Sequence, residues 1–322
     1  MIPALDDLLD RLHVVALPMR VRFRGITVRE VALIDGPAGW GEFGAFPEYQ
    51  TPEAANWLAS GIESAYGTKP PALRDRVPIN ATVPAVTPDQ VPGVLARFPG
   101  ARAAKVKVAE PGQTLADDVA RVNAVRAIIG TVRVDANGGW SVEEAVAAAG
   151  ALTVDGPLEY LEQPCRTVAE LAEVRRRIAR FPGVPVAADE SIRKAADPLA
   201  VVRAGAADVA VLKVAPLGGV SAMLNIAAEI DVPVVVSSAL DSAVGIAAGL
   251  AAAAALPHLG HACGLGTGGL FVEDVADLRL VDGYLRVVDV TPDPARLAAL
   301  AAAPDRRDWW IARVEDCWAW LK

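Results

Sequence analysis

The stretch VRVDANGGW, residues 132–140, carries an apolar, β-branched run into a single acid and then into a glycine turn. Val132 and Val134 alternate with other side chains as in a β-strand, and the alternation stops at Asp135, shortly before the glycine pair. The pattern indicates a strand that ends in a carboxylate. Its meaning depends on whether the chain repeats it.

The same arrangement recurs downstream. LEYLEQP ends a strand-like run near Glu162 and VPVAADES ends one near Asp189, so Asp135 and these two acids follow one another at equal steps along the chain. Lys107, in AAKVKVAE, precedes Asp135 by almost the same step, and Lys213, in VAVLKVAP, follows Asp189 by a slightly shorter one. Five ionisable residues at a nearly constant step predict one such residue in each repeating strand–helix unit.

From residue 77 onward, strand patterns alternate with helical patterns. This order predicts an α/β fold in which a parallel sheet closes into a modified TIM barrel, (β/α)7β. A doubly wound open sheet is the alternative, although none of the early turns carries the Gly-x-Gly-x-x-Gly fingerprint after a strand. The predicted strands are residues 77–84, 103–109, 131–136, 158–163, 185–190, 208–214, 232–238 and 258–264, and the predicted helices are 88–97, 115–129, 141–152, 168–180, 198–204, 220–230 and 242–256.

The two ends of the chain have a different texture. Residues 14–24 and 27–34 read as strands and residues 51–66 as a helix, which is typical of a small α+β domain. Residues 277–288 predict a hairpin around the Asp-Gly pair at 282–283, and an aromatic-rich helix follows. We therefore expect the ends to pack together as an α+β capping domain. The predicted division is 1–76 for its N-terminal part, 77–270 for the catalytic barrel and 271–322 for the segment that returns to the cap.

Composition excludes several classes of protein. The chain has 322 residues, a formal net charge of −8 and a pI near 5.1, which gives no electrostatic footprint for nucleic acid. Its three cysteines form no Cys-x-x-Cys pair, so neither a disulfide framework nor a zinc–thiolate site is indicated. The N-terminus does not read as a secretory signal, and the longest apolar run, residues 243–256, is too short to span a membrane. We expect a cytoplasmic protein without membrane or nucleic-acid partners, and the oligomeric state stays open.

The acids at the strand ends predict a metal site. In a closed βα barrel functional groups lie where strands end, so Asp135, Glu162 and Asp189 should converge on one face. Two unit charges about 4 Å apart repel by about 4 kcal/mol at an effective dielectric of about 20, so three carboxylates need a counter-ion. A hard divalent cation such as Mg²⁺ resolves that conflict. Each acid alone would read as a solvated loop residue or helix cap.

The lysines predict proton transfer at the same face. Lys105 and Lys107 are two apart in one strand and point to the same side, while Val106 and Val108 point to the other side, toward the helices. Lys213 approaches from a strand four places further round; a lysine snorkelling at a strand end is the ordinary alternative. A lysine beside a second ammonium group and a metal should have a lowered pKa, suited to proton abstraction next to a carboxylate.

The charged strand ends form an ordered set of motifs. These are Lys105-x-Lys107, Asp135-x-Asn137, Glu162-Gln163-Pro164, Asp189-Glu190-Ser191 and Lys213. The set resembles the muconate-lactonising subgroup of the enolase superfamily, and the cap texture at both ends fits it, so the resemblance covers nearly the whole chain. It implies that Lys107 is the acid/base lysine, Lys105 its electrostatic neighbour and Lys213 the lysine on the opposite face.

The resemblance also implies roles for the acids and their neighbours. Asp135, Glu162 and Asp189 would be the Mg²⁺ ligands. Asn137 and Glu190 would contact these ligands rather than the metal, although either could equally be a plain turn residue.

Three further segments, residues 19–25, 41–49 and 237–245, are similar to those of the o-succinylbenzoate synthase family. The implied activity is the Mg²⁺-dependent syn dehydration of 2-succinyl-6-hydroxy-2,4-cyclohexadiene-1-carboxylate in menaquinone biosynthesis, with a small-molecule carboxylate as the substrate. Ser237 and Ser238 would contact that substrate; capping of the following helix is the alternative.

Other functions remain open at this point. An N-acylamino acid racemase or dipeptide epimerase would use the same lysines from both faces, and a barrel of this kind could also serve as a non-catalytic binding protein. The glycine-rich run GLGTGG, residues 264–269, could cradle a phosphate, but no lysine follows it, which favours an active-site loop.

Overall fold

The computed structural model describes residues 2–23, 25–180, 184–194 and 196–322. Its central feature is a seven-stranded sheet in which every neighbouring pair is parallel and the strand order follows the chain. The strands are β5 (Ala81–Val83), β6 (Ala103–Lys107), β7 (Thr131–Asp135), β8 (Leu161–Glu162), β9 (Val186–Ala188), β10 (Val209–Leu212) and β11 (Val234–Val236). This order is that of repeated βα units, as predicted.

The edges of this sheet are joined by a short segment near residue 263. Cys263 forms a parallel bridge with Ile79, and Gly264 forms one with Ser237 at the end of β11. The Asn80 amide donates to the Cys263 carbonyl at 3.0 Å, so the strand series closes on itself. The modified barrel is confirmed and an open sheet is wrong, although within the described residues the predicted eighth strand, 258–264, is reduced to these two bridges.

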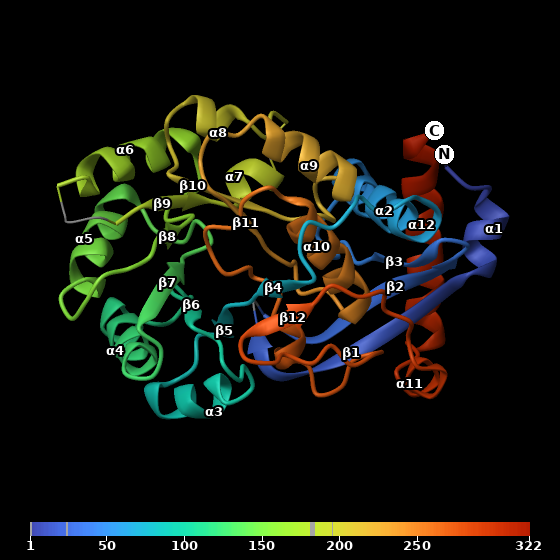
Figure 1. Ribbon diagram of the computed structural model, residues 1–322, viewed down its shortest axis with the longest axis horizontal. Coiled ribbons are helices and arrows are strands. Elements are labelled where there is room, and N and C mark those ends of the chain that lie inside the picture. Colours follow the sequence, from blue (N-terminus) through green and yellow to red (C-terminus); the bar gives the residue numbers. More distant parts are fainter. Residues whose placement is uncertain (1, 24, 181–183, 195) are drawn as a thin grey trace.

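Helices surround the strands (Figure 1). Three of the described α-helices begin with reciprocal capping boxes, in which Thr114, Ser141 or Thr167 accepts from the backbone amide three residues later. None of the described helices is long and apolar enough to cross a membrane. The helices that follow the strands are η1 (Pro88–Gln90), α3 (Val91–Leu95), α4 (Leu115–Arg126), α5 (Val142–Leu152), α6 (Val168–Ile178), α7 (Glu190–Arg193), α8 (Ala200–Arg203), α9 (Val220–Ala228), α10 (Ala243–Ala255) and η2 (Thr267–Leu270).

Both ends of the chain form the cap at one side of the barrel (Figure 1). Trp310 is buried and its ring lies edge-on to Phe43, with 5.4 Å between the centroids, while Trp318 donates to the Pro3 carbonyl at 2.9 Å. The predicted end of the first strand, Arg24, lies outside the described residues. The cap contains one antiparallel sheet of β1 (Leu12–Phe23), β2 (Ile26–Gly36) and β3 (Gly39–Phe43). Its helices are α1 (Leu5–Asp10), α2 (Thr51–Tyr66), α11 (Pro294–Ala299) and α12 (Pro304–Leu321).

Two predicted elements near the cap differ from the structure. The predicted strand 77–84 is divided into β4 (Arg76–Pro78) and β5, and β4 pairs with β12 (Tyr284–Arg286) in a separate antiparallel ribbon. The predicted hairpin has its turn, because Asp282 and Gly283 have φ values of 49° and 80°, but the strand after the turn pairs with β4. The ribbon joins a segment that precedes the barrel strands in the sequence to one that follows them. The predicted domain boundaries at residues 76 and 270 stay a prediction.

The alternation of side chains along the strands places the site. Ala104 and Val106 belong to the apolar core between sheet and helices, so Lys105 and Lys107 point into the barrel, as predicted. A separate apolar cluster lies inside the barrel. Most of its residues are two positions before the charged or polar residue at the end of the same strand. Its members are Tyr160, Ala187, Val209, Val211 and Val235. The barrel interior is therefore apolar in the middle and ionic at the ends of its strands.

Candidate active site

The five charged residues of the predicted series come to one end of the barrel. Lys107, Asp135 and Glu162 are the last residues of β6, β7 and β8, and they are consecutive partners in the parallel register. Asp189 and Lys213 directly follow β9 and β10. Because the strands are parallel, these positions share the C-terminal face, and each of the five side chains belongs to a residue at most 8% exposed.

Each acid is paired with a lysine. Lys107 Nζ lies 2.5 Å from Asp135 Oδ2, and Lys213 Nζ lies 2.6 Å from Asp189 Oδ2. Lys105 donates to both oxygens of Glu162, at 2.8 and 3.1 Å, and lies 3.5 Å from Asp135 Oδ2. The structure thus brings all three predicted lysines into contact with the three predicted acids.

Burial and crowding shift the pKa values of these groups in different directions. Burial, reinforced by Asp135 and Asp189, raises the pKa of Glu162 to about 7. Burial also acts on Asp135 and Asp189, but nearby cations outweigh it, so both pKa values are lowered. Lys105 departs from the lowered lysine pKa that we expected: burial lowers its pKa, but Glu162 and Asp135 outweigh burial and the pKa is raised. Carboxylates, rather than ammonium groups, dominate its surroundings.

The donor chemistry fits a hard divalent cation. Asp135, Glu162 and Asp189 offer buried carboxylate oxygens at neighbouring strand ends, and oxygen is the donor that Mg²⁺ prefers. Burial, together with repulsion from Asp135 and Asp189, raises the pKa of Glu162, so the carboxylates at these strand ends favour a positive charge between them. Among the described residues no three acidic, His or Cys side chains surround one ion position, because these carboxylates turn toward the lysines. Binding a cation therefore requires the acids to exchange partners.

Asn137 and Glu190 connect the lysine to the acids. Lys107 donates to Asn137 Oδ1 at 2.8 Å, and Asn137 Nδ2 donates to Glu190 Oε1 at 3.2 Å. Asn137 has a φ of 48°, in the left-handed region, so the Gly-rich turn after β7 directs its amide back to the site. Asn137 therefore contacts the charged cluster directly, and Glu190 is linked to it through Asn137, while the roles expected of both stay a prediction.

A small cavity lies between the strand ends and the cap. Its volume is about 30 Å³. Ser238 Oγ donates to the Gly264 carbonyl at 3.0 Å and lies 2.8 Å from Thr267 Oγ1, whereas Ser242 caps α10 through the Val244 amide, so capping of that helix by the predicted serines is wrong. The residues around the cavity are Phe23, Phe46, Thr82, Lys105, Lys107, Lys213, Ser237, Ser238, Ala239, Leu240, Gly264 and Thr267.

Comparison with known proteins decides the family. Residues 94–293 match the model of the enolase C-terminal domain-like family, and residues 14–65 match the enolase N-terminal domain-like family. The o-succinylbenzoate synthase of Mycobacterium marinum (strain ATCC BAA-535 / M) is 77% identical over 318 residues, which cover 98% of this chain and 96% of that one. The o-succinylbenzoate synthase of Mycobacterium tuberculosis (strain H37Rv) is 75% identical over 99% of this chain and 97% of its own.

The chain belongs to the o-succinylbenzoate synthase family of the enolase superfamily. The predicted resemblance and the prediction of an enzyme are confirmed, and a non-catalytic barrel is not supported. Solved structures agree on the fold: a muconate lactonizing enzyme from Pseudomonas fluorescens, complexed with muconolactone, has a TM-score of 0.75 at 22% identity and covers 91% of this chain and 98% of its own. The muconate lactonizing enzyme from Pseudomonas putida has a TM-score of 0.71 at 21% identity, with 90% and 98% covered.

Sequence reasoning missed Arg193 at the site of this o-succinylbenzoate synthase family member and gave Gln163, which it quoted in a motif, no role. Arg193 donates from Nε to Asp189 Oδ1 at 2.9 Å and from Nη1 to Tyr49 of the cap at 2.8 Å. Gln163 accepts from the Asp189 amide at 3.0 Å and donates to Ser191 Oγ at 2.7 Å, which ties the ends of β8 and β9 together. A signal existed for Arg193, which stands at the i+4 position from the acid, on the same helical face.

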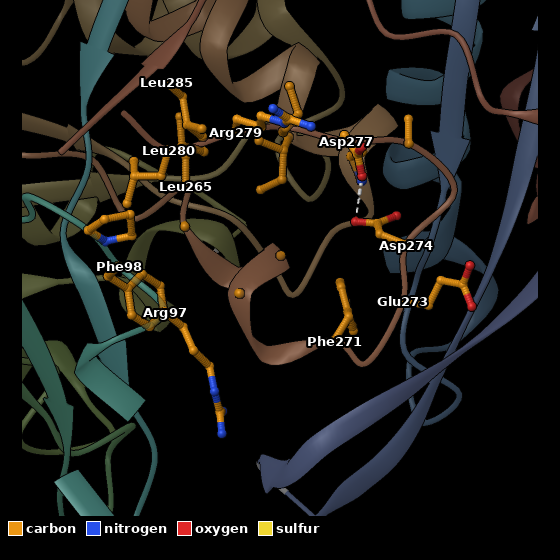
Figure 2. Close-up of a pocket in the computed structure, with 18 of the residues that line it drawn as sticks. Arg97, Phe98, Leu265, Phe271, Glu273, Asp274, Asp277, Arg279, Leu280 and Leu285 are labelled. Carbon is orange, nitrogen blue, oxygen red and sulfur yellow. Dashed lines mark hydrogen bonds between the residues drawn. The ribbon is translucent and has the colours of Figure 1, made fainter. Parts of the chain in front are cut away.

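A larger cavity, of about 760 Å³, lies beside the site, and none of the predicted site residues line it. Figure 2 shows Phe98, Leu265 and Leu280 on one side of it and the carboxylates of Asp274 and Asp277 on the other. The GLGTGG run separates the two cavities, since its residues 264 and 267 border the small one and residues 265, 266, 268 and 269 the large one. The run therefore borders the site, as expected of an active-site loop.

Proposed function

We propose that the protein dehydrates 2-succinyl-6-hydroxy-2,4-cyclohexadiene-1-carboxylate to o-succinylbenzoate, in a Mg²⁺-dependent reaction of menaquinone biosynthesis. One observation carries the proposal: Lys107 and Lys213 stand on β6 and just after β10, with the carboxylates of β7, β8 and β9 between them. A substrate carboxylate placed over those acids would have an ammonium group on either side. The names and identities of the mycobacterial relatives support the choice of substrate.

Lys107 is the acid/base group of the proposal. As a neutral amine it takes the proton from the carbon next to the substrate carboxylate, and the electron pair of that C–H bond moves into the carboxylate to give an enediolate. The pair then forms the last double bond of the ring while the C–O bond to the ring hydroxyl breaks. Lys107 returns the proton to the departing hydroxyl, and water and an aromatic product result. Because one nitrogen serves both steps, hydrogen and hydroxyl leave from the same face. Asn137 orients this nitrogen through its 2.8 Å hydrogen bond.

Cations placed beside the substrate carboxylate complete the arrangement. Asp135, Glu162 and Asp189 would hold a Mg²⁺ ion, which supplies Lewis-acid stabilisation of the negative charge that develops when the proton leaves. Lys105 adds charge beside Lys107, and both would be released from the acids when these bind the cation. The ammonium of Lys107 would then lose its closest anion, which frees this nitrogen to face the substrate.

The remaining groups would bind and orient the substrate. Lys213 faces the ring from the opposite side and stabilises the enediolate through the ring face, a cation–π contact. Ser237 and Ser238 border the cavity beside Lys213 and would lie next to the substrate carboxylate or succinyl group. Glu190, the first residue of α7, would hold Asn137 in place through its 3.2 Å hydrogen bond.

The test follows the diene absorbance of the substrate with purified protein and Mg²⁺. We expect its loss with the wild-type protein and a loss of rate of at least about a thousandfold in Lys107→Ala, because a general base contributes up to about 10⁴-fold. Lys69→Ala, which removes an exposed lysine paired with Asp289, is the matched control and should retain full rate. A protein that binds Mg²⁺ by calorimetry but leaves the diene unchanged would refute the proposal.

A racemase or epimerase of N-acylamino acids or dipeptides is the second candidate, favoured by one observation: an ammonium group stands on each side of the acids. Exchange of the α-proton of such substrates for deuterium, without elimination, would support it. Lys213→Arg should then lose exchange from one enantiomer selectively. Equal loss from both enantiomers would argue against two-base chemistry.

A further inference from the structure

Arg29 lies in β2 of the cap, yet its guanidinium reaches the barrel. The residue is 2% exposed. Its Nε donates to the Leu240 carbonyl at 3.1 Å, and its Nη2 donates to the Gly44 carbonyl. Its Cζ lies 4.4 Å from the centroid of the Phe46 ring, within the range of a cation–π contact. One buried side chain therefore touches two residues, Phe46 and Leu240, that border the cavity at the strand ends.

Leu240 has a backbone conformation that leucine rarely adopts. Its φ is 63°, in the left-handed region, which is unfavourable for an L-residue other than glycine. The neighbouring residues are held from both sides: Asp241 Oδ2 accepts from the Ala239 amide at 3.2 Å, and Glu42 Oε2 of the cap accepts from the Ser242 amide at 3.0 Å. Hydrogen bonds from the cap thus maintain a strained loop at the edge of the cavity.

Phe46, which borders the cavity, belongs to the cap, whereas Leu240 belongs to the barrel. Phe46 lies shortly after the end of β3 and beside Gly44, the second carbonyl that Arg29 binds. The Arg29 guanidinium binds two carbonyls and also stacks on the Phe46 ring. It therefore fixes both the distance and the relative orientation of Phe46 and Leu240, which a flexible apolar side chain would not do.

We propose that Arg29 is a positioning residue for the substrate: it sets the separation of Phe46 and Leu240, the apolar walls contributed by cap and barrel. The inference rests on the proposed dehydration, because it assigns these walls to the ring and succinyl chain of that substrate. Arg29 does not touch the reacting atoms in this assignment. Its loss should therefore weaken substrate binding far more than it slows the chemical step at Lys107.

The test is a double-mutant cycle on the full-length protein with the cyclohexadiene substrate and Mg²⁺. Arg29→Met should raise KM about tenfold and change kcat by less than about threefold, the effect of losing a charge-assisted hydrogen bond. Arg29→Lys keeps the charge over Phe46 but not the fork, so its KM should lie between those of Arg29→Met and the wild type. Leu240→Ala should also raise KM, and combining it with Arg29→Met should add little, because both changes remove the same wall.

Arg306→Met is the matched control. Arg306 pairs with Glu30, the residue next to Arg29 in β2, at 2.7 Å on the other side of that strand. It should leave KM within about twofold and combine additively with Leu240→Ala. A folded Arg29→Met or Arg29→Lys protein with unchanged KM, or additivity between Arg29→Met and Leu240→Ala, would overturn the inference. An inactive wild-type protein would overturn the proposed function together with it, so the two failures are distinguishable.

Discussion

Arg133 and Asp135 stand two positions apart on β7 and point into the same barrel, but their surroundings differ. Arg133, toward the N-terminal end, donates to the Tyr160 hydroxyl at 2.9 Å, the Ala262 carbonyl at 2.8 Å and Glu159 Oε2 at 2.8 Å. These partners are neutral groups and a single carboxylate. The opposite end, around Asp135, gathers three acids and three lysines.

The contrast separates charges that hold the fold from charges that can react. At the N-terminal end the Arg133 guanidinium has fixed acceptors, and its Cζ lies 4.6 Å from the Tyr160 centroid, so the network has little reason to rearrange. At the C-terminal end three carboxylates lie close together, where burial and the neighbouring acids raise the pKa of Glu162, and a new cation can take the place of an ammonium group. Of these two ends, only the C-terminal one favours partner exchange.

Chelation should act on the C-terminal end with the largest effect. Treatment with EDTA is expected to lower turnover of the diene by at least about a thousandfold, because the stabilisation of developing negative charge is lost. The protein should stay folded, since the lysines can pair with the acids, and circular dichroism should be unchanged. Added Mg²⁺ should restore the rate. Full turnover after exhaustive chelation would contradict the assignment of Asp135, Glu162 and Asp189.

Arg133→Met, at the N-terminal end, should lower stability and leave turnover nearly unchanged. Removal of one partner of a buried ionic network should lower the free energy of unfolding by about 3 kcal/mol, measured by urea denaturation. The kcat of the folded fraction should remain within about threefold of wild type. Arg175→Met, which breaks a partly exposed pair with Asp208, is the control and should cost less than about 1 kcal/mol. A stable Arg133→Met protein with lost turnover would reverse the comparison.

The contrast also explains what the sequence could reveal. A strand that ends in an acid is a local pattern, and its repetition at equal steps is enough to place Asp135, Glu162 and Asp189 on one face. The inward direction of Lys105 and Lys107 follows from the alternation with valines. These features depend on neighbours in the chain, so they could be predicted together with the barrel.

Features that depend on distant partners could not be predicted. Arg193 meets Tyr49 across 144 positions, and Arg29 meets Leu240 across 211. The segments of β4 and β12 were expected to be extended, but their pairing joins residues far apart in the chain, and only two bridges, at Cys263 and Gly264, remain of the predicted strand 258–264. Such contacts are selected by the packing of cap on barrel, which no local period reports.

A buried acid outside both ends provides an intermediate case. Glu42, at the junction of cap and barrel, accepts from the Ser242 and Gly245 amides, and burial, reinforced by Asp241, raises its pKa to about 8. A carboxyl with a raised folded-state pKa contributes stability that is complete below its unfolded pKa near 4.5 and is lost as the pH rises through 8. The free energy of unfolding should therefore fall between these pH values, by at most about 1.4 kcal/mol per pH unit from this group.

Glu42→Gln should remove this contribution while keeping an oxygen for the two amides. The difference in unfolding free energy between variant and wild type, measured by urea denaturation at pH 5, 7 and 9, should grow with pH in favour of the variant. Ser242→Ala removes a hydroxyl partner of Glu42 and leaves the carboxyl in place, so its difference from wild type should depend less on pH. A pH-independent difference for Glu42→Gln would show that the carboxyl is not titrating in this range.

The smallest expected effect lies just after the stretch that carries Arg133 and Asp135. Ser141 caps α5, its hydroxyl accepting from the Glu144 amide at 3.3 Å while Glu144 accepts from the Ser141 amide at 2.8 Å. Ser141→Ala should cost about 1 kcal/mol of stability, the usual value for a lost cap, and leave KM and kcat unchanged. Thermal unfolding and the diene assay measure both. Because β7 precedes this cap by only a short turn, a change in kcat would show that the helix start, and not the strand end alone, determines where Asp135 lies.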